Sequence, residues 1–241
     1  MKIDRVMLKL NARAAIRDAK AVPYITALVY VFIAYILQLL YTRIAGVTLD
    51  YEVISKLLNS GNPQAYADYV MEQMPSAGAW FVGELLSIMT MMLSVGLIIN
   101  TLHVRRHEES VVGNLFDGFG NFFRILWLQI LITVFVGLWS LLFVIPGFIA
   151  SYRYSQALYI LIDNPQMSAI DCIRESKRMM RGHKAERFLL DLSFFGWTLL
   201  SLLPFMPVYV FPYIYTTQAA YYDALLDIDH INRRERINGE I

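Results

Sequence analysis

The sequence has little charge for its length. Only 17% of its 241 residues are Asp, Glu, Lys or Arg, whereas 57% are hydrophobic. An average soluble domain carries about 25% charged residues, so this composition excludes an ordinary soluble domain and predicts a membrane protein. The net charge of +1 also gives no basis for a nucleic-acid partner.

Cysteine and recognisable catalytic motifs are also scarce. The single cysteine, Cys172, excludes an intramolecular disulfide. His103 and His107 are four residues apart, but no Glu follows the first one and no third ligand is evident. The first 22 residues lack the apolar core of a secretory signal, so we expect the first membrane helix to drive insertion. No metal, cofactor or catalytic residue is predicted, which disfavours an enzyme.

Long apolar segments are what the sequence has instead. A membrane helix needs roughly 20 mostly apolar residues. Six segments approach this length: 24–44, 77–102, 124–145, 148–162, 188–204 and 208–226. Pro146-Gly147 separates the third from the fourth, and Pro204 and Pro207 separate the fifth from the sixth, which predicts two Pro-bent hairpins. The expected fold is an all-α polytopic membrane helix bundle with about six transmembrane helices, forming one domain over 1–241. In the open alternative, either hairpin is a re-entrant pair of half-helices.

Positive charge is distributed unevenly along these segments. Eighteen of the 21 Lys and Arg residues fall in the two terminal tails and in the loops on the same side of the predicted bundle. The outer loop 45–76 contains only Lys56 and carries several acidic residues. The positive-inside rule therefore predicts a multi-pass plasma-membrane protein with cytoplasmic N- and C-termini.

Two basic amphipathic helices are expected outside the bilayer. The first covers 1–22, with Ile3, Val6, Met7, Leu10 and Ala14 on its apolar face. The second covers 164–186, where Ser168 and Asp171 resemble a capping box and Gly182 is placed to end the helix. Candidate contacts with lipid headgroups are Arg5, Lys9, Arg13, Arg174, Lys177, Arg178 and Arg181. In the alternative interpretation, these charges only maintain the topology.

Three ionisable residues fall within predicted membrane helices: Glu84, Arg153 and Asp191. Burial of such groups is costly, so each is expected to have a partner or to face a polar cavity. Our hypothesis is that Arg153 pairs with Glu84 or Asp191. The pair would either stabilise helix packing or form part of a substrate or proton site.

Several short motifs resemble those of one known family. They are Leu115-Phe116-Asp117-Gly118-Phe119, Ile145-Pro146-Gly147, Ser151-Tyr152-Arg153-Tyr154, Asp163-Asn164-Pro165 and Phe195-Gly196-Trp197. The chain resembles the bacterial membrane family filed as domain of unknown function 975. The resemblance implies a plasma-membrane protein of a Gram-positive bacterium, and it brings no established reaction, substrate or catalytic residue.

Two classes of function are consistent with these features. The first is a non-enzymatic scaffold, regulator or accessory subunit of an envelope or export system. The second is a small transporter or channel-like protein with a polar site near Arg153. The expected partners are membrane lipids, together with a protein partner or a second copy of the chain.

Overall fold

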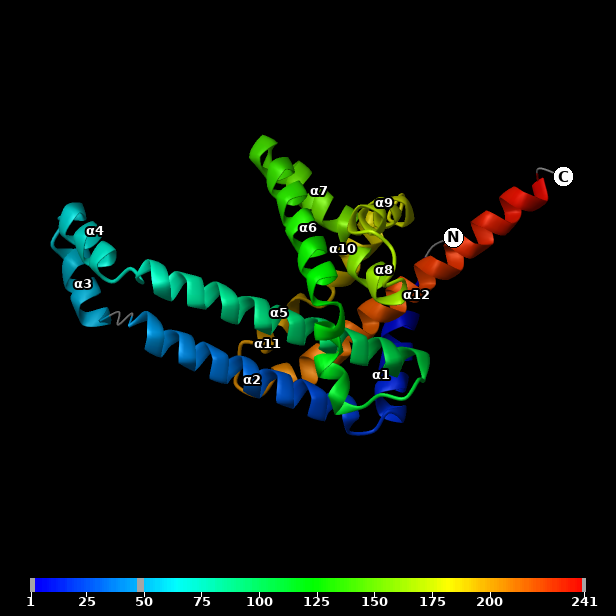
Figure 1. The fold of residues 1–241 in the computed structure, drawn as a ribbon, viewed down its shortest axis with the longest axis horizontal. Coiled ribbons are helices and arrows are strands. Elements are labelled where there is room, and N and C mark those ends of the chain that lie inside the picture. The colour runs from blue at the N-terminus through cyan, green and yellow to red at the C-terminus, as the bar shows by residue number, and fades with distance from the viewer. Residues whose placement is uncertain (1–2, 47–49, 240–241) are drawn as a thin grey trace. The chain divides into compact units, whose positions relative to one another are not determined.

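A computed structural model describes residues 3–46 and 50–239. Within these ranges every regular element is a helix, which confirms the all-α prediction (Figure 1). The ends of the predicted N-terminal helix and outer loop that fall on residues 1–2 and 47–49 lie outside the described residues. The chain forms two compact units, one of Met1–Val31 and Met92–Ile241 and the other of Phe32–Met91.

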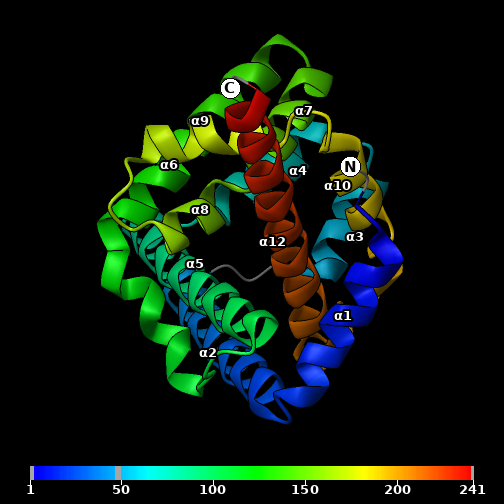
Figure 2. The ribbon, with the colours of Figure 1, turned by 90° about the vertical axis from the view of Figure 1, so that its right-hand side faces the viewer.

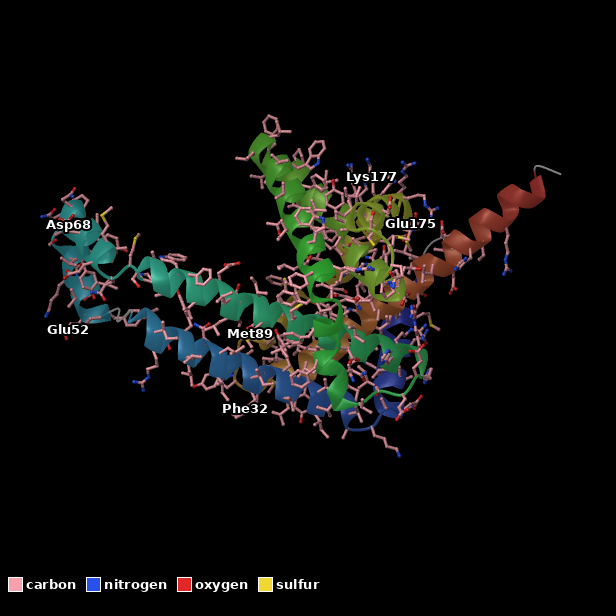
Figure 3. All side chains as sticks on the ribbon, viewed as in Figure 1. Phe32, Glu52, Asp68, Met89, Glu175 and Lys177 are labelled. Atoms are coloured by element: carbon pink, nitrogen blue, oxygen red, sulfur yellow. The ribbon has the colours of Figure 1, made fainter. Side chains whose placement is uncertain are left out.

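The second unit is a helical hairpin. It contains most of α2 (Val22–Ala45), α3 (Tyr51–Asn59), α4 (Pro63–Glu72) and the first half of α5 (Ala77–Arg106). The side chains of Asp50 and Asn62 accept hydrogen bonds from the first free N–H groups of α3 and α4. Glu52 on α3 and Asp68 on α4 keep this end of the hairpin polar (Figure 3). The outer loop is therefore largely helical.

The first unit holds the remaining helices. They are α1 (Arg5–Asp18), the 3₁₀ helix η1 (Val112–Asn121), α6 (Phe122–Leu142), α7 (Val144–Tyr154), α8 (Ala157–Asp163), α9 (Ala169–Met179), α10 (Lys184–Leu192), α11 (Phe195–Leu200) and α12 (Pro207–Gly239). Two glycines bring η1 onto α5. A Cβ atom at Gly96 would overlap the backbone of Leu115, and one at Gly118 would lie 2.6 Å from the Met92 carbonyl oxygen. Only glycine permits so close a backbone approach.

Three helical stretches are long and apolar enough to cross a membrane: Val22–Ala45, Ala77–Arg106 and Val112–Leu142. They correspond to the predicted membrane helices 24–44, 77–102 and 124–145. The chain is thus a membrane protein with three candidate spans. Fewer spans are found than the six expected from the sequence.

The later predicted segments are divided differently in the structure. Segment 148–162 is split between α7 and α8, because the Gln156 N–H donates to Ser176 Oγ (3.1 Å) instead of continuing the helix. Segment 188–204 is split between α10 and α11. Segment 208–226 lies within α12, which continues to Gly239.

The turn between α6 and α7 comes earlier than Pro146-Gly147. Phe143 adopts an extended conformation with φ −160° and ψ 149°, and α7 begins at Val144. Pro146 therefore lies in the first turn of α7, where its missing N–H costs no helical hydrogen bond. The prediction of a bend at Pro146 is wrong in its position, because the chain turns at Phe143, about one helical turn earlier.

The N-terminal helix packs by a different face from the one expected. In α1 the buried residues are Leu8, Ala12, Ala15 and Ile16, whereas Val6, Met7 and Leu10 are exposed. The small alanines let α1 lie close against α12 (Figure 2). The larger apolar side chains are left on the outer face.

The basic helix is shorter than 164–186. It begins after Ser168, whose Oγ accepts from the Asp171 N–H at 3.2 Å and donates to the Asp171 carboxylate at 2.6 Å. It ends at Met179, and Gly182 follows with φ +83°. The predicted cap is confirmed, and Gly182 lies in the turn after the helix end.

Candidate functional site

The most extensive charged cluster of the first unit lies where α5, α8 and α12 meet. The Nη1 and Nη2 atoms of Arg106 donate to the two oxygens of Asp163, both at 2.8 Å. Its Nη2 and Nε atoms also donate to Asp223 Oδ1, at 3.0 and 3.2 Å. One guanidinium therefore joins three helices through two carboxylates, and the fork geometry makes this a strong pair.

Neighbouring groups complete this junction. The Tyr222 hydroxyl donates to Asp163 Oδ2 at 3.0 Å, and its ring stacks on Tyr159 with 5.2 Å between centroids. Arg105 Nε lies 3.8 Å from Asp223 Oδ2. The charged side chains of the junction are between 20% and 27% exposed, so they are partly shielded from water. Both carboxylates therefore accept charge-assisted hydrogen bonds from arginine.

A second junction ties α9 to α12. Arg178 donates to both oxygens of Asp229 and, through Nε, to Glu175 Oε2 at 2.9 Å. Hydrogen bonds to Glu175 and then to Asp229 raise the pKa of Arg178 above its ordinary value. Arg178 therefore remains charged and held between two acids. This placement differs from the lipid contact predicted for it.

Asp191 pairs with a residue that the sequence interpretation did not select. Its Oδ2 accepts from Arg187 Nε at 3.2 Å, one turn earlier in α10. The Arg187 side chain is only 7% exposed, and its guanidinium lies 5.5 Å from the Tyr221 ring centroid. Its Nη1 atom is buried without a hydrogen-bond partner among the described residues.

Arg153 and Glu84 occupy different units. Arg153 is half-buried in α7, and its backbone carbonyl accepts from Ser176 Oγ at 3.0 Å. The described residues give its side chain no ion pair. Glu84 belongs to the second unit, where it lines a groove of about 530 Å³ together with Gln38, Tyr41 and Ser87. The predicted pair of Arg153 and Asp191 is not formed, because Asp191 pairs with Arg187.

Two of the three predicted lipid contacts on α1, Arg5 and Lys9, donate to backbone carbonyls, whereas Arg13 lies over the Tyr213 ring. Arg5 Nη1 and Lys9 Nζ donate to the carbonyl oxygens of Leu189 and Ser193, at 3.4 and 3.3 Å. Burial, followed by the charges of Arg13 and Arg5, lowers the pKa of Lys9. These cations therefore cover the exposed carbonyls at the end of α10, a favourable place for positive charge.

The predicted lipid contacts on α9 fall into two groups. Arg174 pairs with Asp171 at 2.6 Å, and Arg178 belongs to the second junction. Lys177 (Figure 3) is exposed, as is Arg181. Of the predicted contacts on α9, these two are the ones without an ion pair among the described residues, as expected of a headgroup contact.

The sequence interpretation therefore did not select most residues of the two junctions (Arg105, Arg106, Asp163, Glu175, Asp223 and Asp229), and it did not select Arg187, the partner of Asp191. The four-residue spacing of Arg187 and Asp191 was an available signal. No such signal was available for the pairing of Arg106, because its partners lie 57 and 117 residues away. Among the described residues, no group of three or more His, Cys, Asp or Glu side chains is placed to hold a metal ion.

Residues 141–229 match the model of a family described as "Protein of unknown function (DUF975)". This region includes α7 to α11, Asp163, Arg178, Asp191 and most of α12. No curated protein and no solved structure matches the chain. The predicted resemblance is confirmed over this range.

Proposed function

We propose that this chain is a non-enzymatic plasma-membrane protein that scaffolds, regulates or assists an envelope or export system. The observation that carries the proposal is the pairing of charge at the helix junctions. Arg106 is held by Asp163 and Asp223, and Arg178 by Glu175 and Asp229. Breaking such a pair leaves an uncompensated charge, so the pairs favour one arrangement of the helices. A rigid helical platform is suited to holding other proteins.

The contacts of the first hairpin support a complete return across the membrane. Arg124, near the start of α6, donates to Gln166 at 3.2 Å, just after the end of α8. Asp163 at the end of α8 also reaches Arg106 at the end of α5. Since α6 lies beside α7, the pair α7–α8 brings the chain back to the level where α6 begins.

The contacts of the second hairpin favour the re-entrant alternative. Tyr209, in the first turn of α12, lies 5.5 Å from Tyr24 near the start of α2, measured between ring centroids. Further along α12, Asp223 reaches Arg106 at the end of α5. Both ends belong to the cytoplasmic side of the positive-inside assignment. We therefore propose four crossings, by α2, α5, α6 and α7–α8, and a second hairpin that enters from the cytoplasm without crossing.

Cysteine labelling in intact cells tests this topology. Single reporters at Ser60, Phe143, Lys177 and Leu202 are introduced in a Cys172→Ser background. An impermeant maleimide is expected to label Ser60→Cys and Phe143→Cys from outside, and Lys177→Cys only after permeabilisation. Leu202→Cys is decisive: four crossings leave it unlabelled in intact cells, whereas six crossings make it accessible from outside.

The scaffold role is tested by deleting the gene in its bacterial host and measuring protein export and envelope integrity. Complementation by the wild type is expected to restore both, and Arg106→Gln is expected to restore them only partly at equal protein level. Arg105→Gln is the matched control, because its contact with Asp223 is longer at 3.8 Å. Full restoration by Arg106→Gln would argue against a rigid platform.

A transporter or channel-like protein is the second candidate. Three buried polar atoms near the break after α7 and within α12 have no hydrogen-bond partner among the described residues: Gln156 Oε1, Tyr159 Oη and Thr216 Oγ1. Broken helices with unpaired polar groups are typical of transporter sites, and Arg153 lies beside this break. Proteoliposome swelling in iso-osmotic glycerol, amino-acid and salt solutions distinguishes the candidates. A scaffold leaves swelling at the rate of empty liposomes, whereas a pore accelerates it and Thr216→Val changes the rate.

A further inference from the structure

A cavity of about 560 Å³ lies in the first unit between the end of α1, the start of α2 and the start of α12. Three cations line it: Arg13, Arg17 and Lys20. Among the described residues, no carboxylate lines it. Asp18 Oδ1 lies 4.0 Å from Arg17 Nε, with both side chains more than half exposed. The cavity is therefore strongly positive, and the exposed pair with Asp18 neutralises little of that charge.

These cations differ from the arginines of the two junctions. The guanidinium groups of Arg106 and Arg178 each donate hydrogen bonds to two carboxylates. Among the described residues, Arg13 and Lys20 have no ion pair, so their donors are available to a ligand. Arg13 is held by its stacking on Tyr213, with 5.0 Å from the guanidinium carbon to the ring centroid.

The backbone at Lys20 is unusual. Lys20 has φ +57°, a left-handed conformation that normally favours Gly or Asn. Lys20 follows the C-cap of α1, where a left-handed residue commonly ends a helix. This turn between α1 and α2 makes Lys20 one of the residues that line the cavity.

Aromatic rings form the other wall. Tyr24, Trp197 and Tyr209 line the cavity beside the cations. Tyr24 is two residues into α2, one of the candidate membrane spans, so the cavity lies at the level where that helix begins. Tyrosine and tryptophan gather at the headgroup level of a bilayer. Basic side chains at that level attract anionic lipid.

We propose that this cavity binds the phosphate of an anionic phospholipid headgroup. Arg13, Arg17 and Lys20 supply the donors, and the aromatic rings pack against the glycerol and the first acyl carbons. The cavity volume is within the range of small-ligand sites. The site lies in the cytoplasmic leaflet if the proposed topology holds, but binding itself depends on neither that topology nor the scaffold role.

The test uses the full chain in nanodiscs and the position of Trp197 in the cavity. Trp80, Trp127 and Trp139 are replaced by Phe, so that Trp197 alone reports. Nanodiscs of phosphatidylcholine receive increasing amounts of phosphatidylglycerol that carries a quencher near its headgroup, and labelled phosphatidylcholine serves as the neutral probe. Labelled phosphatidylglycerol is expected to quench Trp197 at a much lower mole fraction than the neutral lipid.

Charge removal identifies the site. Each cation near the surface is expected to change lipid affinity about fivefold, so Arg13→Gln with Lys20→Gln should raise the half-quenching fraction about 25-fold. The control pair Lys177→Gln with Arg181→Gln removes the same charge from α9 and is expected to have little effect on Trp197. The single variant Lys20→Gln, at an exposed position, gives the fivefold change without disturbing the packing of Arg13 on Tyr213.

Other outcomes overturn the proposal. Equal quenching by the two lipids, or equal effects of the two double variants, would mean that no specific site exists. A third arm adds inorganic phosphate and glycerol phosphate. If either displaces the labelled lipid at millimolar concentration, the site takes a soluble phosphate, and the assignment to lipid is wrong.

Discussion

At the scale of single residues, Arg106 joins three helices of the first unit. From α5 it makes four hydrogen bonds to two carboxylates, Asp163 on α8 and Asp223 on α12. Removing the guanidinium leaves Asp163 and Asp223 facing one another with only Arg105 nearby, at 3.8 Å from Asp223. The cost of such an unpaired group is several kcal/mol when it is fully buried, and less here because the junction is partly exposed.

We therefore expect Arg106→Gln to destabilise the fold by about 2 kcal/mol. For a chain of this size, this lowers the Tm by about 4–8 °C. Thermal unfolding of the detergent-solubilised protein, followed by circular dichroism, measures the change. Arg105→Gln is expected to lower the Tm by much less. A similar fall in both variants would show that charge in general, rather than the Arg106 fork, stabilises the junction.

Cys172 gives a prediction about pH. It is fully buried in α9, and burial, followed by the charge of Asp171, raises the pKa of its thiol to about 11. Since the thiolate is the reactive form, iodoacetamide should label native Cys172 far more slowly at pH 8 than an exposed thiol. Labelling kinetics by mass spectrometry measure this, with Lys177→Cys in a Cys172→Ser background as the exposed control.

The raised pKa also affects stability. Between the ordinary thiol pKa and about 11, the folded state binds more protons at Cys172 than the unfolded state. Its contribution to stability is therefore complete below that interval and is lost as the pH rises through it. Equal labelling rates for Cys172 and the exposed control at pH 8 would contradict both statements.

At the scale of elements, the contact between α5 and η1 depends on the absence of a side chain. A Cβ atom at Gly96 would overlap the backbone of Leu115, which cannot move as a flexible side chain would. Gly96→Ala should therefore cost about 1–3 kcal/mol. Gly120 in η1 has open space around its Cα, so Gly120→Ala is the matched control. Limited proteolysis of the loop before η1 and the Tm of both variants test this, and equal Tm values would refute the close approach.

The sequence predicted elements well where one short rule was sufficient. The three long apolar helices, the cap at Ser168 and the family resemblance, which is confirmed over 141–229, were all predicted from local pattern. The break after Tyr154 was not, because it depends on a hydrogen bond from the Gln156 N–H to Ser176, 20 residues away. The hydropathy of the sequence is apolar on both sides of this break, so hydropathy alone predicts one continuous helix.

The face of α1 shows the same limit. Its pattern predicts one apolar face of Ile3, Val6, Met7, Leu10 and Ala14. In the structure Ile3 is buried, whereas Val6, Met7 and Leu10 are exposed. Packing is instead decided by Ala12 and Ala15, which are small enough for a close approach to α12. Asp191 differs from these cases, because its partner Arg187 lies four residues earlier in the same helix and the spacing alone could have predicted the pair.

At the scale of the whole molecule, the region that matches the family model does not contain all of its own stabilising contacts. Arg106 precedes residues 141–229, whereas Asp163 and Asp223 lie within them. The packing of α1 on α12 also joins the two ends of the chain. The N-terminal and C-terminal parts of the first unit should therefore bind one another even when the chain is cut between them.

We expect two fragments, 1–109 and 110–241, to associate when they are expressed together. The cut falls in the loop before η1, where Glu108 and Glu109 are exposed and outside any helix, so it should disturb little of the backbone. An affinity tag on the first fragment should recover the second from detergent extracts, and the complex should show the Tm behaviour of an intact first unit. Arg106→Gln in the first fragment should reduce recovery several-fold, because it removes the bidentate pair with Asp163 and the bonds to Asp223.

Arg43→Gln, a charge removal in the second unit, should leave recovery unchanged. If Arg106→Gln and Arg43→Gln behave alike, apolar packing alone holds the two halves together, and the junction at Arg106 does not determine the assembly of the first unit.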